Sequence, residues 1–298
     1  MLRIGVDMGG TKIEAAAVAE DGQIALRRRV PPPRDDYDAT IAAVVALVHD
    51  LDEQVGQAMT VGVGMPGTIS PATGLVKNAN SVWLNGRPLD RDLRSALGRP
   101  VRLANDANCF ALSEARGGAA AGASTVFGVI IGTGTGGGIV VNGRVLTGRN
   151  AVAGEWGHNP LPWPRADEIP GAHCYCGLRG CIETFLSGPG LARDHAARTG
   201  EERNPMEIVQ RAEGGDAAAE ASLQRYEDRC ARALASVINV VDPDVIVLGG
   251  GMSNIPRLYT NVPRLWARYV FSDRVDTTLV APRFGDSSGV RGAAWLWE

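Results

Sequence analysis

Three cysteines and a histidine between residues 158 and 181 are the most closely grouped metal-binding side chains in the sequence. Cys174 and Cys176 are separated by one residue, Cys181 follows five residues after Cys176, and His158 lies upstream. Three thiolates and one imidazole make up the ligand set of a closed tetrahedral Zn²⁺ site, which has no open position for catalysis. A disulfide or three unrelated thiols are the alternatives. The spacing favours a structural zinc ion (Zn2+) that shapes the surrounding loop.

Four carboxylates stand where they could bind a ligand or take part in catalysis. Glu155 and Glu183 lie on either side of the proposed zinc ligands. Asp7 ends a short apolar run, where a buried carboxylate is costly unless a cation compensates it. We interpret Asp7 as a ligand of a phosphate-bound magnesium ion (Mg2+), with a capped turn as the alternative. Asp106 opens a helical pattern after the run 101–104, so it is either a helix N-cap or a functional carboxylate.

Three glycine-rich turns follow apolar runs that are typical of buried strands. Glycine at a strand end lets the backbone approach a ligand and point several N–H groups at one anion. Threonines interleave the first two turns, and the third stands at a strand-to-helix junction, so a phosphate cradle is favoured over ordinary tight turns. The residues that we expect to bind ATP are Asp7, Gly9, Gly10, Thr11, Lys12, Gly132, Thr133, Gly134, Thr135, Gly136, Gly137, Gly138, Gly249, Gly250 and Gly251.

Neither of two better-known nucleotide motifs fits these turns. The segment 9–12 lacks the G-x-x-x-x-G-K-[ST] spacing of a P-loop. The segment 132–137 matches G-x-G-x-x-G, but an apolar strand pattern and an Asn-Gly turn follow it instead of a helix. The sequence therefore predicts hairpins with phosphates at their tips, and ATP in a cleft between two related domains.

The elements that position these residues alternate between strand and helix. Residues 4–9 and 127–132 superimpose in their apolar and glycine positions, which indicates one architectural unit used twice. Alternation of this kind predicts an α/β fold. The expected strands are 4–7, 13–18, 61–65, 101–104, 126–131, 139–141 and 245–248, and the expected helices are 39–55, 90–97, 106 onward, 217–241 and 289–298, with a domain junction at 117–122.

Length, composition and charge bound the class of protein. The 298 residues correspond to about two domains, and 45% hydrophobic with 21% charged residues exclude a disordered, collagen-like or coiled-coil chain. A formal charge of −3 gives no positive field for nucleic acid or a membrane surface. No export signal, no run of about 20 apolar residues and an odd number of cysteines predict a cytoplasmic protein with reduced thiols.

Taken in order, several of these segments resemble the signature motifs of the ROK family of sugar kinases. Among its members, the chain looks most like bacterial fructokinases of the mannofructokinase type, and N-acetylglucosamine kinases are close relatives. The segments that carry the resemblance are 7–12, 103–108, 154–158, 174–183 and 249–251, with 78–86, 155–163 and 285–295 pointing to fructokinases.

The resemblance implies a two-domain, actin-like ATPase fold of the ribonuclease H-like type, with a duplicated βββαβα core. It assigns residues 1–115 plus 289–298 to a small N-terminal domain and 116–288 to a large C-terminal domain, usually in a homodimer. Asp106 matches the catalytic base, and His158, Cys174, Cys176 and Cys181 match zinc ligands. The positions expected to contact the sugar are Gly67, Asn80, Asn105, Asp106, Glu155, His158 and Glu183.

The implied reaction is transfer of the ATP γ-phosphoryl group to the 6-hydroxyl of a hexose, with D-fructose as the main expectation. N-acetylglucosamine, glucose or mannose is the alternative substrate. A sugar-responsive transcription regulator is an alternative of another class, but it needs a DNA-binding module that an expected first strand at residue 2 or 3 leaves no room for. Trp83, Trp156 and Trp163 either stack on the sugar or belong to the core.

Overall fold

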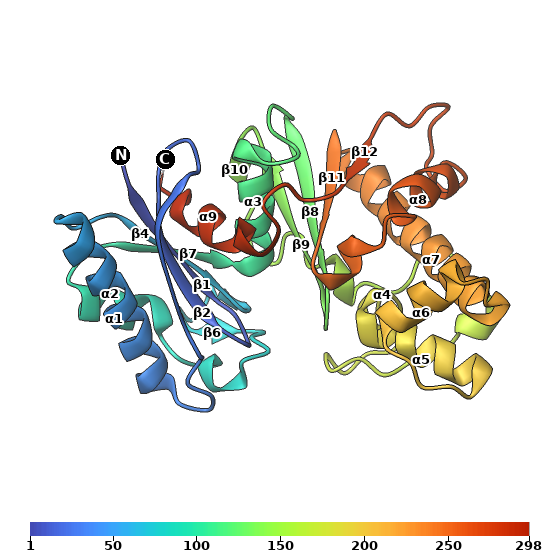
Figure 1. Ribbon diagram of the computed structural model, residues 1–298, viewed down its shortest axis with the longest axis horizontal. Helices are drawn as coiled ribbons and strands as arrows, with labels where there is room; N and C mark the ends of the chain where they lie inside the picture. The colour runs from blue at the N-terminus through green and yellow to red at the C-terminus, as the bar shows by residue number, and fades with distance from the viewer. Residues whose placement is uncertain (298) are drawn as a thin grey trace. The chain divides into compact units, whose positions relative to one another are not determined.

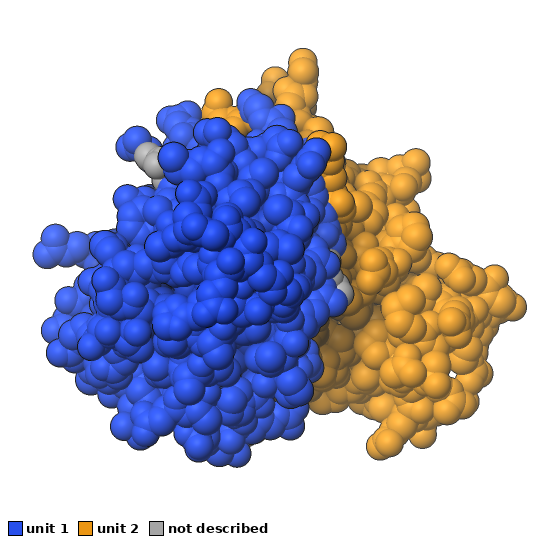
Figure 2. All heavy atoms as spheres, turned by 60° about the vertical axis from the view of Figure 1, so that its left-hand side comes forward, with its two compact units in different colours: residues 1–122, 138–153, 284–298 blue, residues 123–137, 154–283 orange. Residues whose placement is uncertain are grey.

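The structure is a computed structural model that describes residues 1–297, except for the side chain of Asp286. It consists of two compact units, coloured separately in Figure 2. Unit 1 comprises Met1–Gly122, Gly138–Ala153 and Phe284–Glu298, and unit 2 comprises Ala123–Gly137 and Gly154–Arg283. The last residue of the predicted helix 289–298, Glu298, lies outside the described residues.

Two five-stranded sheets share one strand order, which confirms the α/β fold and the predicted repeat. In the first sheet, β1 pairs antiparallel with β2 and parallel with β4, and β4 pairs parallel with β7. In the second sheet, β11 pairs parallel with both β8 and β12. The first sheet contains, in spatial order, β3 (Ile24–Val30), β2 (Ile13–Val18), β1 (Arg3–Met8), β4 (Val61–Met65) and β7 (Val101–Asn105). The second contains β10 (Arg144–Val145), β9 (Thr135–Val141), β8 (Thr125–Ile131), β11 (Val245–Gly249) and β12 (Thr278–Val280).

Helices cover both faces of the first sheet, and strand alternation decides which side chains meet them. Ile4 and Val6 of β1 pack into the core with α1 (Tyr37–Val55) and α2 (Leu89–Leu97), opposite α9 (Ser288–Ala294) in Figure 1. Gly5 faces α9, where an added Cβ would lie 1.8 Å from the Val290 carbonyl oxygen. Close approach of α9 therefore requires glycine at this position, and it places Asp7 on the same face.

The remaining elements of unit 1 complete its edge and its loops. α3 (Asp106–Gly117) follows β7 directly and packs against α9. A small two-stranded sheet and two single turns of 3-10 helix are the other regular elements: β5 (Thr68–Ile69), β6 (Val76–Lys77), η1 (Val82–Leu84) and η5 (Gly285–Ser287).

Unit 2 is mainly helical outside its strands. α7 (Ala217–Val241) is the longest helix, as predicted, and it ends where Asp242 adopts a left-handed conformation before Pro243. The other elements are η2 (Trp156–His158), η3 (Ala166–Glu168), α4 (Glu183–Leu186), α5 (Gly188–Thr199), α6 (Pro205–Glu213), η4 (Gly251–Asn254) and α8 (Leu258–Trp266). Of the helices in the described part of the chain, none combines the length and apolar character needed to cross a membrane.

Two features differ from the sequence expectations. Strand β3 was not predicted, because Arg27–Arg29 interrupt its apolar residues; two of these arginines pair with Glu14 of the neighbouring strand. Residues 116–122, 138–153 and 284–288 were expected in the second domain but belong to unit 1. The physical reason is packing: an added Cβ on Gly138 would lie 2.6 Å from the Ala107 carbonyl oxygen, so β9 runs directly against α3.

Candidate functional site

Asp7 is a partly buried carboxylate with two other acids, Asp106 and Glu14, in its surroundings. Among the residues that the structure describes, it receives no hydrogen bond, and an added Cβ on Gly289 would lie 2.8 Å from its Oδ2. Burial first, then the charges of Asp106 and Glu14, raise the pKa of Asp7 to about 7, against a lowering by Lys12. A site that raises the pKa of an acid in this way favours a bound cation. Carboxylate oxygen is a ligand that Mg²⁺ accepts, so the donor fits the predicted ion.

Asp106 is the first residue of α3, and Asn105 is the N-cap. The Asn105 side chain accepts a hydrogen bond from the Ala107 N–H at 2.9 Å, so the N-cap interpretation of Asp106 is wrong. Asp106 Oδ1 also accepts from the Ala107 N–H, at 2.8 Å. Burial raises the pKa of Asp106, and hydrogen bonds, the first from Ala107, oppose this. The helix start therefore holds the carboxylate in place while burial makes it a stronger proton acceptor.

Gly67 and Asn105 come together beside Asp106. Asn105 Nδ2 donates a hydrogen bond to the Gly67 carbonyl at 3.2 Å. Gly67 has a φ of 69°, and a Cβ on it would lie 2.4 Å from the Lys77 carbonyl oxygen, so only glycine fits there. Asn80 is exposed on the following loop. Asn85, which the sequence analysis did not single out, holds that loop through two 2.9 Å hydrogen bonds with the backbone of Ala79.

The first glycine turn joins β1 to β2 as a hairpin. The Gly9 N–H donates to the Lys12 carbonyl at 3.0 Å, and open space surrounds the Cβ position of Gly10. The Lys12 ammonium lies 3.2 Å from Glu14, a carboxylate that is 1% exposed. Glu14 was missed as a partner, although a single acid within the apolar run 13–18 is a visible signal.

The second and third glycine turns lie together in unit 2. The Gly132 N–H donates to the Gly134 carbonyl at 2.9 Å, and the Gly132 carbonyl accepts from Gly188 at the start of α5, at 2.8 Å. Gly250 has a φ of 79° and packs against the end of β8, where its Cβ would lie 2.4 Å from the Ile131 carbonyl oxygen. The structure thus brings together two of the predicted phosphate turns.

Gly137 and Gly138 have a packing role in β9. A Cβ on Gly137 would lie 2.8 Å from the Phe127 ring and 2.9 Å from the Trp156 ring. Glycine at these two positions is therefore explained by close packing of the strand, without a ligand.

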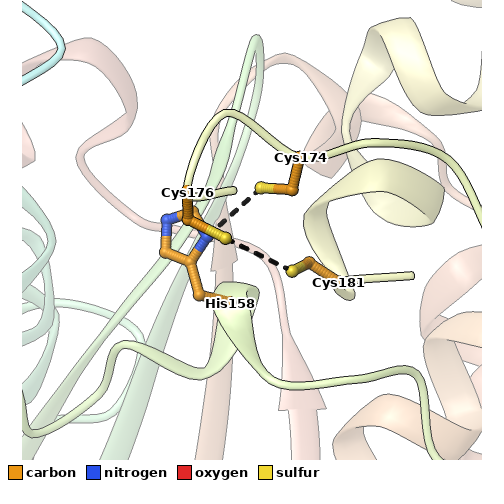
Figure 3. A group of neighbouring side chains, drawn as sticks. All are labelled: His158, Cys174, Cys176 and Cys181. Atoms are coloured by element: carbon orange, nitrogen blue, oxygen red, sulfur yellow. Dashed lines mark hydrogen bonds between the residues drawn. The ribbon is translucent and has the colours of Figure 1, made fainter. Parts of the chain in front are cut away.

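Figure 3 shows the four predicted metal ligands pointing toward one another. Their ligand atoms all lie within 4.8 Å of one another. The Sγ atoms of Cys176 and Cys181 are 3.7 Å apart, and Cys174 Sγ is 3.4 Å from His158 Nδ1. A tetrahedron with Zn–S bonds of about 2.3 Å has edges of about 3.8 Å. The arrangement therefore fits a zinc ion in size and chemistry, and no disulfide joins these cysteines.

Tyr175 is a functional candidate that the sequence analysis missed, since it occupies the variable position between two cysteines. Its hydroxyl lies 3.0 Å from His158 Nε2, the ring nitrogen that faces away from the thiols. Tyr175 is 73% exposed, and partial desolvation of its phenol, followed by the charges of Glu183 and Glu155, raises its pKa. The phenol, the imidazole and the two glutamates therefore share one region of unit 2.

Glu183 begins α4 and connects two parts of unit 2. Its Oε2 accepts a hydrogen bond from the Thr135 N–H at 3.0 Å. The Cys174 thiol lies 3.7 Å from its Oε1. Glu183 thus touches both the second glycine turn and the proposed zinc cluster.

A buried ion network holds the segment that leads from His158 to the cysteines. Arg232 of α7 is 1% exposed and donates hydrogen bonds to Glu168 and to the carbonyls of Pro162 and Trp163. Burial opposes ionisation of Glu168, but hydrogen bonds from Arg232 and Arg229 lower its pKa to about 2. The network was not predicted, because its members are far apart in the sequence.

Trp83, Trp156 and Trp163 were the candidates for stacking on the sugar, and the first two pack in or against the core. Trp83 packs against the core of unit 1, and Trp156 is 4% exposed and packs edge-on against Phe127. Trp163 is half-exposed and stacks on Tyr269.

The duplicated sheets, with glycine hairpins at the starts of both halves, define an actin-like ATPase fold. The sequence pattern of the ROK family matches residues 3–298. The N-acetyl-D-glucosamine kinase of Pasteurella multocida is 41% identical over 302 residues, which cover 99% of each chain. Among solved structures, the ROK hexokinase from Thermus thermophilus is 32% identical with a TM-score of 0.86, covering 99% of this chain and 97% of the other. A ROK family glucokinase from Streptomyces griseus, in complex with glucose and AMPPNP, is 30% identical with a TM-score of 0.80, covering 99% of both chains. The chain belongs to the ROK family.

Proposed function

We propose that this protein transfers the γ-phosphoryl group of ATP to the 6-hydroxyl of N-acetyl-D-glucosamine. The broader class, an ATP-dependent sugar kinase of the ROK family, follows from its full-length relatives. The narrower choice of sugar rests on one observation, the 41% identity to an N-acetyl-D-glucosamine kinase over 99% of both chains. That similarity favours the alternative substrate of the sequence analysis over its main expectation, D-fructose.

Asp106 would act as the proton acceptor for the sugar hydroxyl. Phosphoryl transfer is largely dissociative, so the base needs to orient the hydroxyl and take its proton late. The helix start fixes the Asp106 carboxylate through Ala107, and its raised pKa increases its proton affinity. Asp7 would hold Mg²⁺, which neutralises phosphate charge when it is bound.

Glu155, His158 and Glu183 would bind the other polar groups of the sugar. Acceptors in a site built to bind hydroxyl groups discriminate strongly, because a sugar that lacks the matching hydroxyl leaves them unpaired. Cys174, Cys176, Cys181 and His158 Nδ1 would hold zinc, which supplies a rigid centre for this loop and no reacting group.

We also expect the protein to be cytoplasmic and to form a homodimer. Ligand thiols that must stay reduced are compatible with the cytoplasm. The homodimer that the resemblance implies stays a prediction, and light scattering on the purified chain tests it.

The test is a coupled ADP-release assay with ATP and Mg²⁺ across N-acetylglucosamine, glucose, mannose and fructose. We expect kcat/KM for N-acetylglucosamine to exceed that for each of the other sugars by at least tenfold. A tenfold preference for fructose or glucose would refute the choice of sugar, and no turnover with any of the four would refute the kinase assignment.

A further inference from the structure

We propose that Gly134 and Thr135, in the glycine turn 132–135, position the sugar-binding carboxylate of Glu183. The inference rests on the proposed function, because it takes Glu183 as a sugar ligand. It adds a role on the sugar side to the one that the sequence predicts for Gly134 and Thr135.

A direct hydrogen bond carries the first part of the argument. The Thr135 N–H donates to Glu183 Oε2 at 3.0 Å, so this backbone donor is already used by a carboxylate of the chain itself. A hydrogen bond to an ionised acceptor is roughly twice as strong as one between neutral groups. Thr135 is 5% exposed, and its carbonyl oxygen would lie 2.0 Å from a Cβ on Gly157, so the residue is packed beneath that glycine. Its side chain is therefore buried, and its Oγ1 has no hydrogen-bond partner among the described residues.

Position 134 has no side chain, and the space beside it is filled by the Glu183 carboxylate. An ideal Cβ on Gly134 would lie 2.7 Å from Glu183 Oε2, closer than real Cβ contacts are found. The backbone of Gly134 is not left-handed, so its conformation alone does not call for glycine. The Glu183 carboxylate, at the end of a flexible side chain, would therefore have to move to admit a methyl group at position 134.

The backbone of Glu183 is fixed independently of its side chain. Glu183 begins α4 two residues after Cys181, and its carbonyl accepts a hydrogen bond from the Ser187 N–H at 3.1 Å. With the backbone held at the cysteine cluster, the position of the carboxylate is set by the turn at Oε2 and by the Cys174 thiol, 3.7 Å from Oε1. A ligand that moves the turn therefore moves the sugar-binding oxygen.

The matched pair of substitutions is Gly134→Ala and Gly132→Ala, two residues apart in the same turn. Open space surrounds the Cβ position of Gly132, so alanine there disturbs no residue of the chain. We expect Gly134→Ala to raise the KM for the sugar about tenfold, because the added methyl group displaces the Glu183 carboxylate. We expect Gly132→Ala to leave the KM for the sugar within twofold, whatever it does to the KM for ATP.

A double-mutant cycle separates an effect through Glu183 from a general disturbance of the turn. In the Glu183→Ala background no carboxylate remains for the added methyl group to displace. We therefore expect Gly134→Ala to weaken sugar binding about tenfold in the wild-type background and less than twofold in the Glu183→Ala background, measured as Kd by calorimetry. Equal losses in both backgrounds, or no loss in either, would overturn the proposal.

Hydrogen exchange gives a second readout if Gly134→Ala does not fold. The Thr135 amide should exchange at least ten times faster in Glu183→Ala than in the wild type, and unchanged exchange would overturn the proposal. The sugar for these measurements is the member of the four-sugar panel that wild type turns over fastest. Absence of turnover refutes the proposed function, whereas turnover without these effects refutes only the role of the turn.

Discussion

Replacing Asp7 with asparagine should stabilise the metal-free protein at neutral pH while removing its activity. The Asp7 carboxylate has a pKa of about 7 in the folded chain, against an ordinary value of 3.8. Between these two values the folded state keeps a proton that the unfolded state has lost. Folding stability therefore falls as pH rises through this window, which is the opposite of a carboxylate in a salt bridge.

The size of the effect follows from the width of the window. Between pH 3.8 and about pH 7, each pH unit lowers the free energy of unfolding of the wild type by about 1.4 kcal/mol. Above pH 7 the total loss is about 4 kcal/mol. An asparagine side chain has the same shape as the aspartate and no charge, so it avoids this cost. Asp7→Asn should then exceed wild type in free energy of unfolding by about 1.6 kcal/mol at pH 5 and about 4 kcal/mol at pH 8. Water drawn toward the charged carboxylate would reduce both figures without changing their order.

Urea unfolding of both proteins at pH 5 and pH 8, without added Mg²⁺, measures these differences. Adding Mg²⁺ and ATP at pH 8 should reduce the difference in free energy of unfolding between Asp7→Asn and wild type, since a bound cation stabilises only the charged carboxylate. The reasoning fails if Asp7→Asn is no more stable than wild type at pH 8, or if its advantage is the same at both pH values. Turnover within tenfold of wild type would remove Asp7 from the Mg²⁺ role.

Three further predictions concern other parts of the chain. Asp106→Asn should lower kcat about 10²–10⁴-fold, the usual contribution of a positioned acid–base group, with little change in sugar Kd; kcat within tenfold of wild type would contradict the base role. Metal analysis should find one zinc ion per chain, and Cys176→Ser should release it while lowering both stability and sugar affinity; a native protein without zinc would refute the site. Arg232→Met should cost about 3–5 kcal/mol of unfolding free energy, because it leaves Glu168 buried without its main partner. In the same urea experiments the half-exposed Arg165→Met serves as the control and should cost less than about 1 kcal/mol, and equal losses for the two would argue against the buried network.

Local sequence was sufficient where neighbouring residues decide the conformation. Short apolar runs followed by glycine turns predicted strands β1, β2 and β8 and the hairpins that follow β1 and β8. Cys174, Cys176 and Cys181 lie close along the chain and therefore close in space, and the structure groups them with His158, as expected; zinc itself stays a prediction.

Sequence reasoning was weaker where a residue's role depends on a distant partner. Strand β3 was not predicted because its arginines make the segment look polar. In the structure Glu14 of the adjacent strand pairs with two of them, Arg27 and Arg29. Asp106 could not be separated from an N-cap until Asn105 was seen to fill that role. Glycines that read alike in the sequence proved different: Gly132 faces open space, whereas Gly134 faces the Glu183 carboxylate.

The motifs and their order along the chain were thus enough to predict the family and the repeated α/β architecture. The sequence also showed which carboxylates, thiols and glycines could form a site. Only the tertiary structure decided which of these groups share a charge environment or a hydrogen bond. Burial, and then the charge of Asp106 about a hundred residues away, raise the pKa of Asp7, and a carboxylate from α4 accepts the hydrogen bond of the Thr135 N–H. Burial and contacts in space determine the pKa of a side chain and its hydrogen-bond partners. Neither can be deduced from how far apart two residues are in the sequence.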